Sequence, residues 1–199
     1  MRFLSYISNM AKNLDHLGIK SIVNSYDLFF IDLWGVVHNG IKLYENSIDV
    51  LDNLASAKKD FVLLTNAPRP NANVVNFLKK MGLKKYFENV FTSGEAAHKY
   101  LVNELQKQKF YHIGPPRDFD LFIDFENKKS KEIKTSNYIL CTGLFDGYDQ
   151  NLNYYKDLFN GHTKKKMICT NPDLIVDRGN KRELCAGSVA MVFEKLGGK

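Results

Sequence analysis

Two short apolar runs, each followed directly by polar residues, constrain the fold of this chain more than any other feature. Leu28–Ile31 precedes Asp32. Phe61–Leu64 precedes Thr65 and Asn66. Such runs are typical of parallel strands buried on both faces, because half-exposed strands alternate apolar and polar residues. Since the carboxyl ends of parallel strands meet at one edge of a sheet, where open α/β folds bind ligands, we expect Asp32, Thr65 and Asn66 to lie close together.

These three polar side chains suit phosphoryl transfer. A carboxylate such as that of Asp32 can attack phosphorus and form an aspartyl-phosphate. The Thr65 hydroxyl and the Asn66 amide can bind the phosphoryl oxygens during that step. The alternative is that Asp32 merely starts a turn, but a lone aspartate would not explain why the next strand also ends in polar residues.

The segments around these runs have helical periodicity. Residues 47–57 and 71–81 each place apolar side chains on one stripe. A third short strand at residues 90–91 leads into a helix over residues 92–105. The alternation of strand and helix predicts a parallel sheet with helices on its faces. Residues 1–25 precede it as an amphipathic helical lead-in and a turn.

The second half of the chain predicts another α/β unit. Expected strands cover residues 110–113, 138–141 and 167–170, and expected helices cover residues 152–159 and 184–196. We place the boundary in the polar stretch after residue 105, which divides the chain into units 1–105 and 106–199.

Composition narrows the function class. The chain has 44% hydrophobic residues, which can support a packed core and so exclude a disordered chain. Three cysteines without CxxC spacing predict buried thiols in a reducing, cytoplasmic setting. No apolar run reaches the length of a membrane span. The net charge of +6 can attract phosphorylated metabolites, whereas nucleic-acid binding lacks any supporting motif.

Several short motifs resemble the haloacid dehalogenase superfamily, in its NagD-like phosphatase branch. They are Asp32-Leu33-Trp34-Gly35-Val36, Thr65-Asn66, the helix start Thr92-Ser93-Gly94-Glu95, Thr170-Asn171-Pro172-Asp173 and Ala186-Gly187-Ser188. The resemblance implies a Rossmann-like three-layer parallel-sheet core, incomplete in this chain, with an inserted α/β cap of the C2 type.

The resemblance also implies roles for individual residues. Asp32 would be the nucleophile and, with the backbone carbonyl of Trp34, a ligand of Mg²⁺. Thr65, Asn66 and Gly35 would bind the phosphoryl group. The cap loop would contribute Asn171 and Asp173 to substrate choice, although a plain Asn-Pro turn is the alternative for that loop.

Trp34 stands where phosphatases of this family have their second aspartate. That carboxylic acid protonates the leaving oxygen, and an indole cannot do so. The loss of such a group lowers rates by about 10²–10⁴-fold. His38, in a turn closed by Asn39-Gly40, is the candidate substitute acid, and the alternative is a solvent-facing turn histidine.

The chain is also short for this family. The Gly-Lys-Pro motif and the later acidic pair that complete the family's site are not found in it. We therefore expect a C-terminally truncated or split hydrolase with little activity as a 199-residue chain. The alternative is a protein that binds a phosphorylated metabolite or a partner, the partner being a second copy or a separately encoded C-terminal half.

Overall fold

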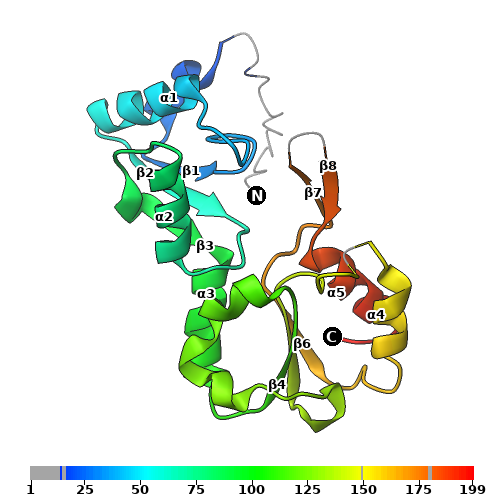
Figure 1. Ribbon diagram of the computed structural model, residues 1–199. Helices are drawn as coiled ribbons and strands as arrows, with labels where there is room; N and C mark the ends of the chain where they lie inside the picture. Colours follow the sequence, from blue (N-terminus) through cyan, green and yellow to red (C-terminus); the bar gives the residue numbers. More distant parts are fainter. Residues whose placement is uncertain (1–13, 15–16, 149, 179–180) are drawn as a thin grey trace, which may run out of the picture.

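The computed structural model describes residue 14 and residues 17–148, 150–178 and 181–199 (Figure 1). Two parallel three-stranded sheets organise this part of the chain, and an antiparallel hairpin lies between them. Most of the predicted lead-in helix lies outside the described residues. Residues 17–25 form two short 3₁₀ turns, Ile19–Ser21 and Val23–Ser25, and the second includes the predicted turn at residues 24–25.

The first sheet has the strand order β1-β2-β3, and all its strands are parallel. Its strands are β1 (Leu28–Asp32), β2 (Asp60–Thr65) and β3 (Val90–Thr92). Helix α1 (Glu45–Ser56) connects β1 to β2, and helix α2 (Asn71–Lys80) follows β2. This order of elements is the one that the sequence pattern predicts.

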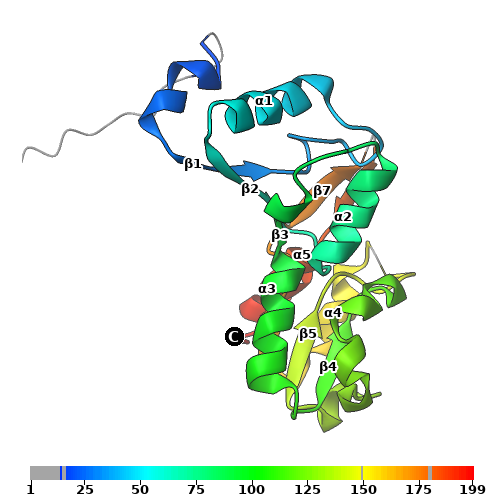
Figure 2. The ribbon, with the colours of Figure 1, turned by 90° about the vertical axis from the view of Figure 1, so that its left-hand side faces the viewer.

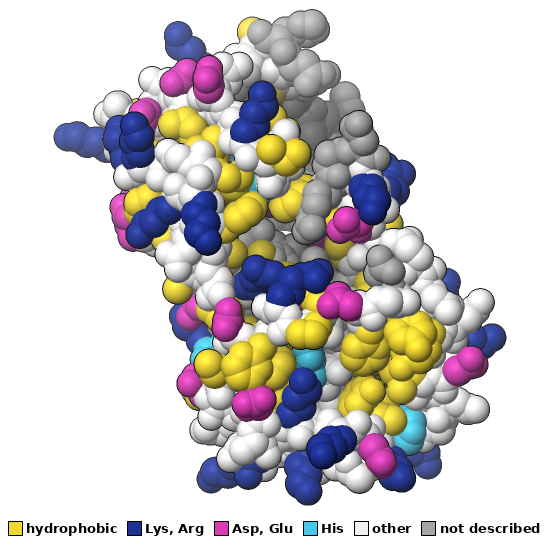
Figure 3. Space-filling model, in the orientation of Figure 1, with side chains coloured by type: hydrophobic (Ala, Val, Ile, Leu, Met, Phe, Trp, Pro, Cys, Tyr) yellow, Lys and Arg dark blue, Asp and Glu magenta, His cyan; other side chains and the backbone are white. Residues whose placement is uncertain are grey.

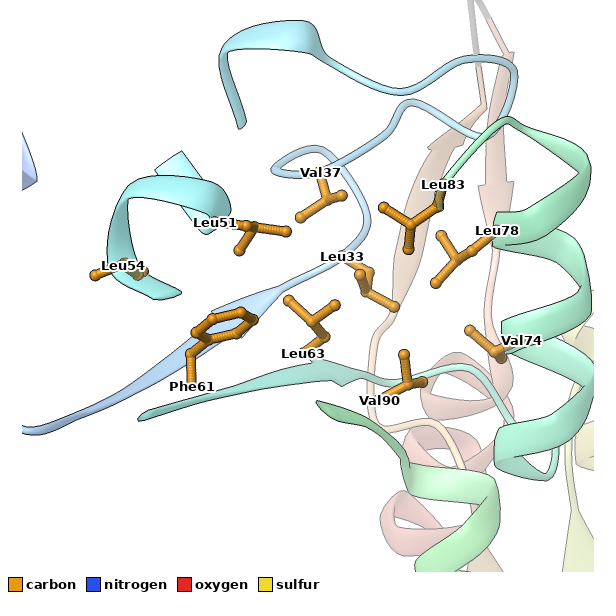
Figure 4. Packing of buried hydrophobic residues seen from close by; sticks show 10 residues of the cluster. All are labelled: Leu33, Val37, Leu51, Leu54, Phe61, Leu63, Val74, Leu78, Leu83 and Val90. Atoms are coloured by element: carbon orange, nitrogen blue, oxygen red, sulfur yellow. The ribbon is translucent and has the colours of Figure 1, made fainter. Parts of the chain in front are cut away.

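Both helices pack on the same face of this sheet (Figure 4). The core between them contains Leu51 and Leu54 from α1, Val74 and Leu78 from α2, and Leu63 from β2. The apolar stripes of the two helices therefore bury themselves against one side of the strands.

The opposite face of the first sheet is open among the described residues. Leu28 and Phe30 of β1 are 47% and 67% exposed, while Phe29 and Ile31 face the core. A hollow of about 610 Å³ runs along this open face and is lined by Phe30, Val62, Leu64 and Phe91, among others. The prediction that β1 is buried on both faces is therefore wrong for the described residues, because helices cover only one of them.

The second sheet is covered on both faces. Its parallel strands are β4 (Phe110–Ile113), β5 (Tyr138–Cys141) and β6 (Lys166–Cys169). Helices α4 (Leu152–Leu158) and α5 (Ala186–Lys195) pack on one face. Short 3₁₀ segments and the end of a long helix pack on the other. Besides the two early turns, the 3₁₀ segments are Phe87–Asn89, Pro116–Leu121, Ile123–Lys128 and Ile133–Thr135.

That long helix joins the two units. Helix α3 (Ser93–Tyr100) starts at the end of β3 and continues through a π-helical turn, Leu101–Leu105, whose leucines pack against the second sheet (Figure 2). The boundary that we place after residue 105 stays a prediction.

The hairpin of β7 (Ile175–Arg178) and β8 (Lys181–Leu184) extends from the second unit toward the first sheet (Figure 1). Because Leu184 ends β8, the last helix starts at Ala186 and not at the predicted residue 184. None of the helices among the described residues has the length and apolar character to cross a membrane.

Candidate functional site

Asp32 and Thr65 lie at the same edge of the first sheet, as the sequence predicts. Asp32 is the last residue of β1 and stands in register with Leu64, the residue before Thr65. The Asp32 side chain is exposed, and its Oδ1 accepts a hydrogen bond from the backbone N–H of Leu33 at 2.7 Å. The Thr65 hydroxyl accepts from the N–H of Ala67 at 3.2 Å, so its own proton remains available to an acceptor. A carboxylate and a hydroxyl therefore end two neighbouring strands at one edge of the sheet.

The turn after β1 is fixed by its backbone. The Leu33 carbonyl accepts from the N–H groups of Val37 and His38, and the Gly35 N–H donates to the His38 carbonyl at 2.7 Å. Gly35 has a φ of 79°, which only glycine adopts without strain. The Gly35 N–H is thus used inside the turn, and its role as a phosphate contact stays a prediction.

His38 is buried, with 3% of its surface exposed, so the interpretation as a solvent-facing turn residue is wrong. Its Nδ1 accepts from the N–H of Gly40 at 2.9 Å, which places the proton of the neutral ring on Nε2. Its ring packs edge-on between Trp34 and Phe77. Burial lowers the pKa of His38, and the negative charge of Asp32 opposes that shift only in part. His38 is therefore a neutral hydrogen-bond donor near Asp32 at neutral pH.

The Trp34 side chain connects the two units. Its indole Nε1–H donates to the backbone carbonyl of Asp177 in β7 at 2.9 Å. Gly40 lies against the ring so closely that a Cβ there would come within 2.5 Å of it. Where the resembled phosphatases have an acid, this chain has a side chain that binds the hairpin of the second unit.

Further contacts cross between the units in the loop that follows β2. The Asn66 Nδ2 donates to both carboxylate oxygens of Asp173, each at 3.1 Å. Arg69 Nε lies 3.5 Å from an oxygen of Asp118. The structure thus brings together Asn66 and Asp173, which the resemblance assigns to opposite sides of one site.

Asn171 shapes the loop that presents Asp173. Its Oδ1 accepts from the backbone N–H of Asp173 at 2.9 Å, and its carbonyl accepts from the Cys169 thiol at 3.2 Å. The Asn171 side chain therefore holds the turn. Its contact with substrate stays a prediction.

Sequence reasoning missed Arg69 and Asp118. Asp118 is buried, and the Thr142 hydroxyl binds its carboxylate. Thr142 in turn lies 2.8 Å from His112 Nε2. Burial raises the pKa of Asp118, while the hydrogen bond from Thr142 and the charge of Arg69 oppose the rise. The only signal in the sequence is that Arg69 follows Thr65-Asn66 by three residues.

The residues at this edge do not make a complete magnesium site. Mg²⁺ requires near-octahedral oxygen coordination, usually with several retained waters and one or two carboxylates besides the substrate's phosphate. The expected protein ligands are the Asp32 carboxylate and the Trp34 carbonyl. Across the part of the chain that the structure describes, no group of three His, Cys, Asp or Glu side chains could hold a metal ion.

All three cysteines are free thiols. Cys141 and Cys185 are buried as expected, whereas Cys169 is only half-buried.

Comparisons with known proteins agree with the fold. The family of haloacid dehalogenase-like hydrolases matches residues 29–126. A haloacid dehalogenase-like hydrolase from Brucella suis 1330 is 29% identical, with a TM-score of 0.81 over 91% of this chain and 69% of that chain. NagD from E. coli K-12, at 18% identity, shares the fold with a TM-score of 0.61 over 87% of this chain and 67% of its own.

Among curated proteins, phosphoglycolate phosphatase 2 of Arabidopsis thaliana is 26% identical over 164 residues, which cover 72% of this chain and 53% of that protein. The chain spans about half the length of the curated relatives it matches. The residues that the family matches include Asp32, Thr65 and Asn66. The chain is thus similar to haloacid dehalogenase-like hydrolases, in sequence over residues 29–126 and in fold over most of its length.

Proposed function

We propose that this chain carries the nucleophile of a phosphoric-ester hydrolase that acts on small phosphorylated metabolites. The observation that carries the proposal is the position of Asp32 at the end of β1, at the same edge as the end of β2, where Thr65 is followed by Asn66 with its contact to Asp173. Relatives named phosphoglycolate phosphatase and 4-nitrophenylphosphatase support this substrate class.

In the proposed reaction an Asp32 oxygen attacks phosphorus, forms an aspartyl-phosphate and displaces the ester oxygen. The hydroxyl of Thr65 and the amide of Asn66 hold the phosphoryl oxygens. The departing ester oxygen must take a proton from solvent, because the Trp34 indole has no acidic proton to give. Water then attacks the aspartyl-phosphate and releases phosphate.

His38 is too rarely protonated to replace the missing carboxyl group fully. Its pKa is lowered by burial, so the imidazolium form that could donate a proton is rare at neutral pH. We propose that its Nε2–H acts as a hydrogen-bond donor near Asp32. Turnover should consequently be slow, and slowest for esters with poor leaving groups.

The test compares an aryl and an alkyl phosphate with the purified chain in the presence of Mg²⁺. We expect p-nitrophenyl phosphate to be hydrolysed about 10²–10⁴ times faster than 2-phosphoglycolate, since an aryl oxide needs no general acid to leave. Asp32→Asn should abolish both reactions. Asp60→Asn is the matched control, because Asp60 is exposed and begins β2 at the opposite edge of the sheet.

Two results would contradict the proposal. Hydrolysis that survives Asp32→Asn would remove Asp32 as the nucleophile. Hydrolysis of both esters at similar high rates would show that another group supplies the proton that Trp34 cannot.

A second candidate function is self-association through the open face of the first sheet. Leu28 and Phe30 are exposed, and no strand of the described residues pairs with the outer edge of β1, which favours this candidate because exposed apolar strand edges pair readily. Sedimentation velocity of the wild type and of Phe30→Glu would decide. A concentration-dependent dimer that the substitution abolishes supports the candidate, and a monomer in both proteins removes it.

A further inference from the structure

Three of the contacts between the two units share one chemical pattern, whereas the Trp34 indole binds a backbone carbonyl of the hairpin. The first unit supplies N–H donors from the loop and helix that follow β2, and the second unit supplies carboxylates. Asn66 binds Asp173, and Arg69 pairs with Asp118. A third pair, Asn73 with Asp120, has the same polarity. In these three contacts the first unit binds carboxylate oxygens of the second.

The donors in the first two pairs lie next to the proposed phosphoryl site. Asn66 follows Thr65 directly, and Arg69 lies three residues further along the same loop. The loop is held in place by the start of α3, because the Gly94 N–H donates to the Ala67 carbonyl at 3.1 Å. A Cβ on Gly94 would come within 2.2 Å of the Arg69 backbone nitrogen, so only glycine permits this close packing.

Carboxylate and phosphate oxygens accept hydrogen bonds from the same partners with similar geometry. Asp173 presents two oxygens to one amide group at equal distances of 3.1 Å, as a phosphate would. Asp118 presents its oxygen to a guanidinium, the side chain best suited to phosphate. On the face shown in Figure 3, Lys and Arg side chains also gather at the narrow waist between the two units, which favours an anion there.

We propose that Asn66 and Arg69 form an oxyanion-binding site in which Asp173 and Asp118 act as internal ligands, so that a phosphate group and the docked second unit compete for the same donors. The proposal rests on the proposed function for the location of the phosphate group. It adds that binding of the anion breaks the contacts between the units, whereas the family resemblance implies a cap that closes over the substrate.

The chain contains a reporter for this competition. Trp34 is the single tryptophan among 199 residues, and its indole binds the second unit at Asp177. If an anion displaces Asp173 from Asn66, the hairpin that begins two residues after Asp173 moves with it, and the indole gains contact with water. The emission maximum of the protein should then shift to longer wavelength.

The experiment titrates the full chain with inorganic phosphate at constant ionic strength and follows tryptophan emission. We expect a saturable shift to longer wavelength. Asp173→Asn should tighten phosphate binding by about fivefold, the equivalent of one exposed polar contact. Arg69→Gln should weaken it by about tenfold or more, because a charge-assisted hydrogen bond to the anion is lost. Glu132→Gln removes an exposed carboxylate that pairs with Lys134, outside the contacts of Asn66, Arg69 and Asp118, and should change nothing.

Each other outcome overturns the inference. If Asp173→Asn weakens phosphate binding, Asp173 helps to hold the ligand and does not compete with it. If phosphate leaves the emission unchanged or shifts it to shorter wavelength, the anion does not separate the units. The proposed function is judged separately, since saturable phosphate binding without Asp32-dependent hydrolysis would refute the hydrolase and leave the competition intact.

Discussion

Acid should destabilise the second unit through His112, a buried imidazole that binds Thr142. The His112 side chain is 5% exposed, and burial, with a smaller effect from the charge of Lys129, lowers its pKa to about 3. In the unfolded chain the same ring takes up a proton near pH 6.5. Between these values the unfolded state binds one more proton than the folded state. The stability contributed by neutral His112 is therefore complete above pH 6.5 and is lost as the pH falls toward 3.

The size of this effect follows from the two pKa values. They differ by about 3.5 units, and each unit corresponds to about 1.4 kcal/mol, so the full loss is about 5 kcal/mol. At pH 5 the unfolded ring is almost fully protonated while the folded ring is not. The free energy of unfolding should then be about 2 kcal/mol lower than at pH 8 on account of this residue alone.

The assay is urea unfolding of the wild type and of His112→Gln at pH 8, 6 and 5. Glutamine can still donate to Thr142 but does not titrate, so the difference between the two proteins isolates the imidazole. We expect that difference to fall by about 2 kcal/mol between pH 8 and pH 5. His162→Gln controls for the exchange of histidine for glutamine as such. A difference that is independent of pH, or an NMR titration of His112 with a midpoint near 6.5, would refute the reasoning.

Four further substitutions probe three separate features. Trp34→Phe keeps an aromatic ring but removes the hydrogen bond to the hairpin, which should weaken docking by about 1 kcal/mol and appear as a larger radius of gyration in solution scattering. Gly94→Ala forces the start of α3 away from the Arg69 backbone and should lower the free energy of urea unfolding by about 2–3 kcal/mol. Leu63→Ala, in the core, should lower the free energy of urea unfolding by about 2–5 kcal/mol. Phe30→Ser, on the open face, should change it by no more than about 0.5 kcal/mol. Equal losses for the two variants would contradict a core on one side of the sheet.

Much of the first unit could be predicted because its signals are local. The run before Asp32 and the run before Thr65 mark their own strands, and parallel pairing then brings their ends together. The glycine-containing turn after β1 was also recognisable, since Asn39 and Gly40 are typical turn residues and Gly40 has a φ of 82°. These features depend on a few neighbouring residues each.

The contacts between the units could not be predicted in this way. The bond from Trp34 to Asp177 joins residues 143 positions apart, and the pairing of Arg69 with Asp118 depends on how two separately folded sheets meet. The environment of His38 was missed for the same reason, because Phe77 of α2 covers its ring. The open face of β1 also has no local signal, because an apolar run has the same sequence pattern whether helices cover one face of the strand or both.

The continuous path of helix from α3 into the π-helical turn has a mechanical consequence. Ser93 to Leu105 amounts to a rod of about 20 Å at the rise of an α-helix. One end is fixed in the first sheet and the other is embedded in the second. A tilt of about 10° at the fixed end would carry the far end through about 3–4 Å. The rod therefore acts as a lever arm, and a dihedral change at its base too small to disturb either sheet would be amplified into a displacement large enough to admit a ligand.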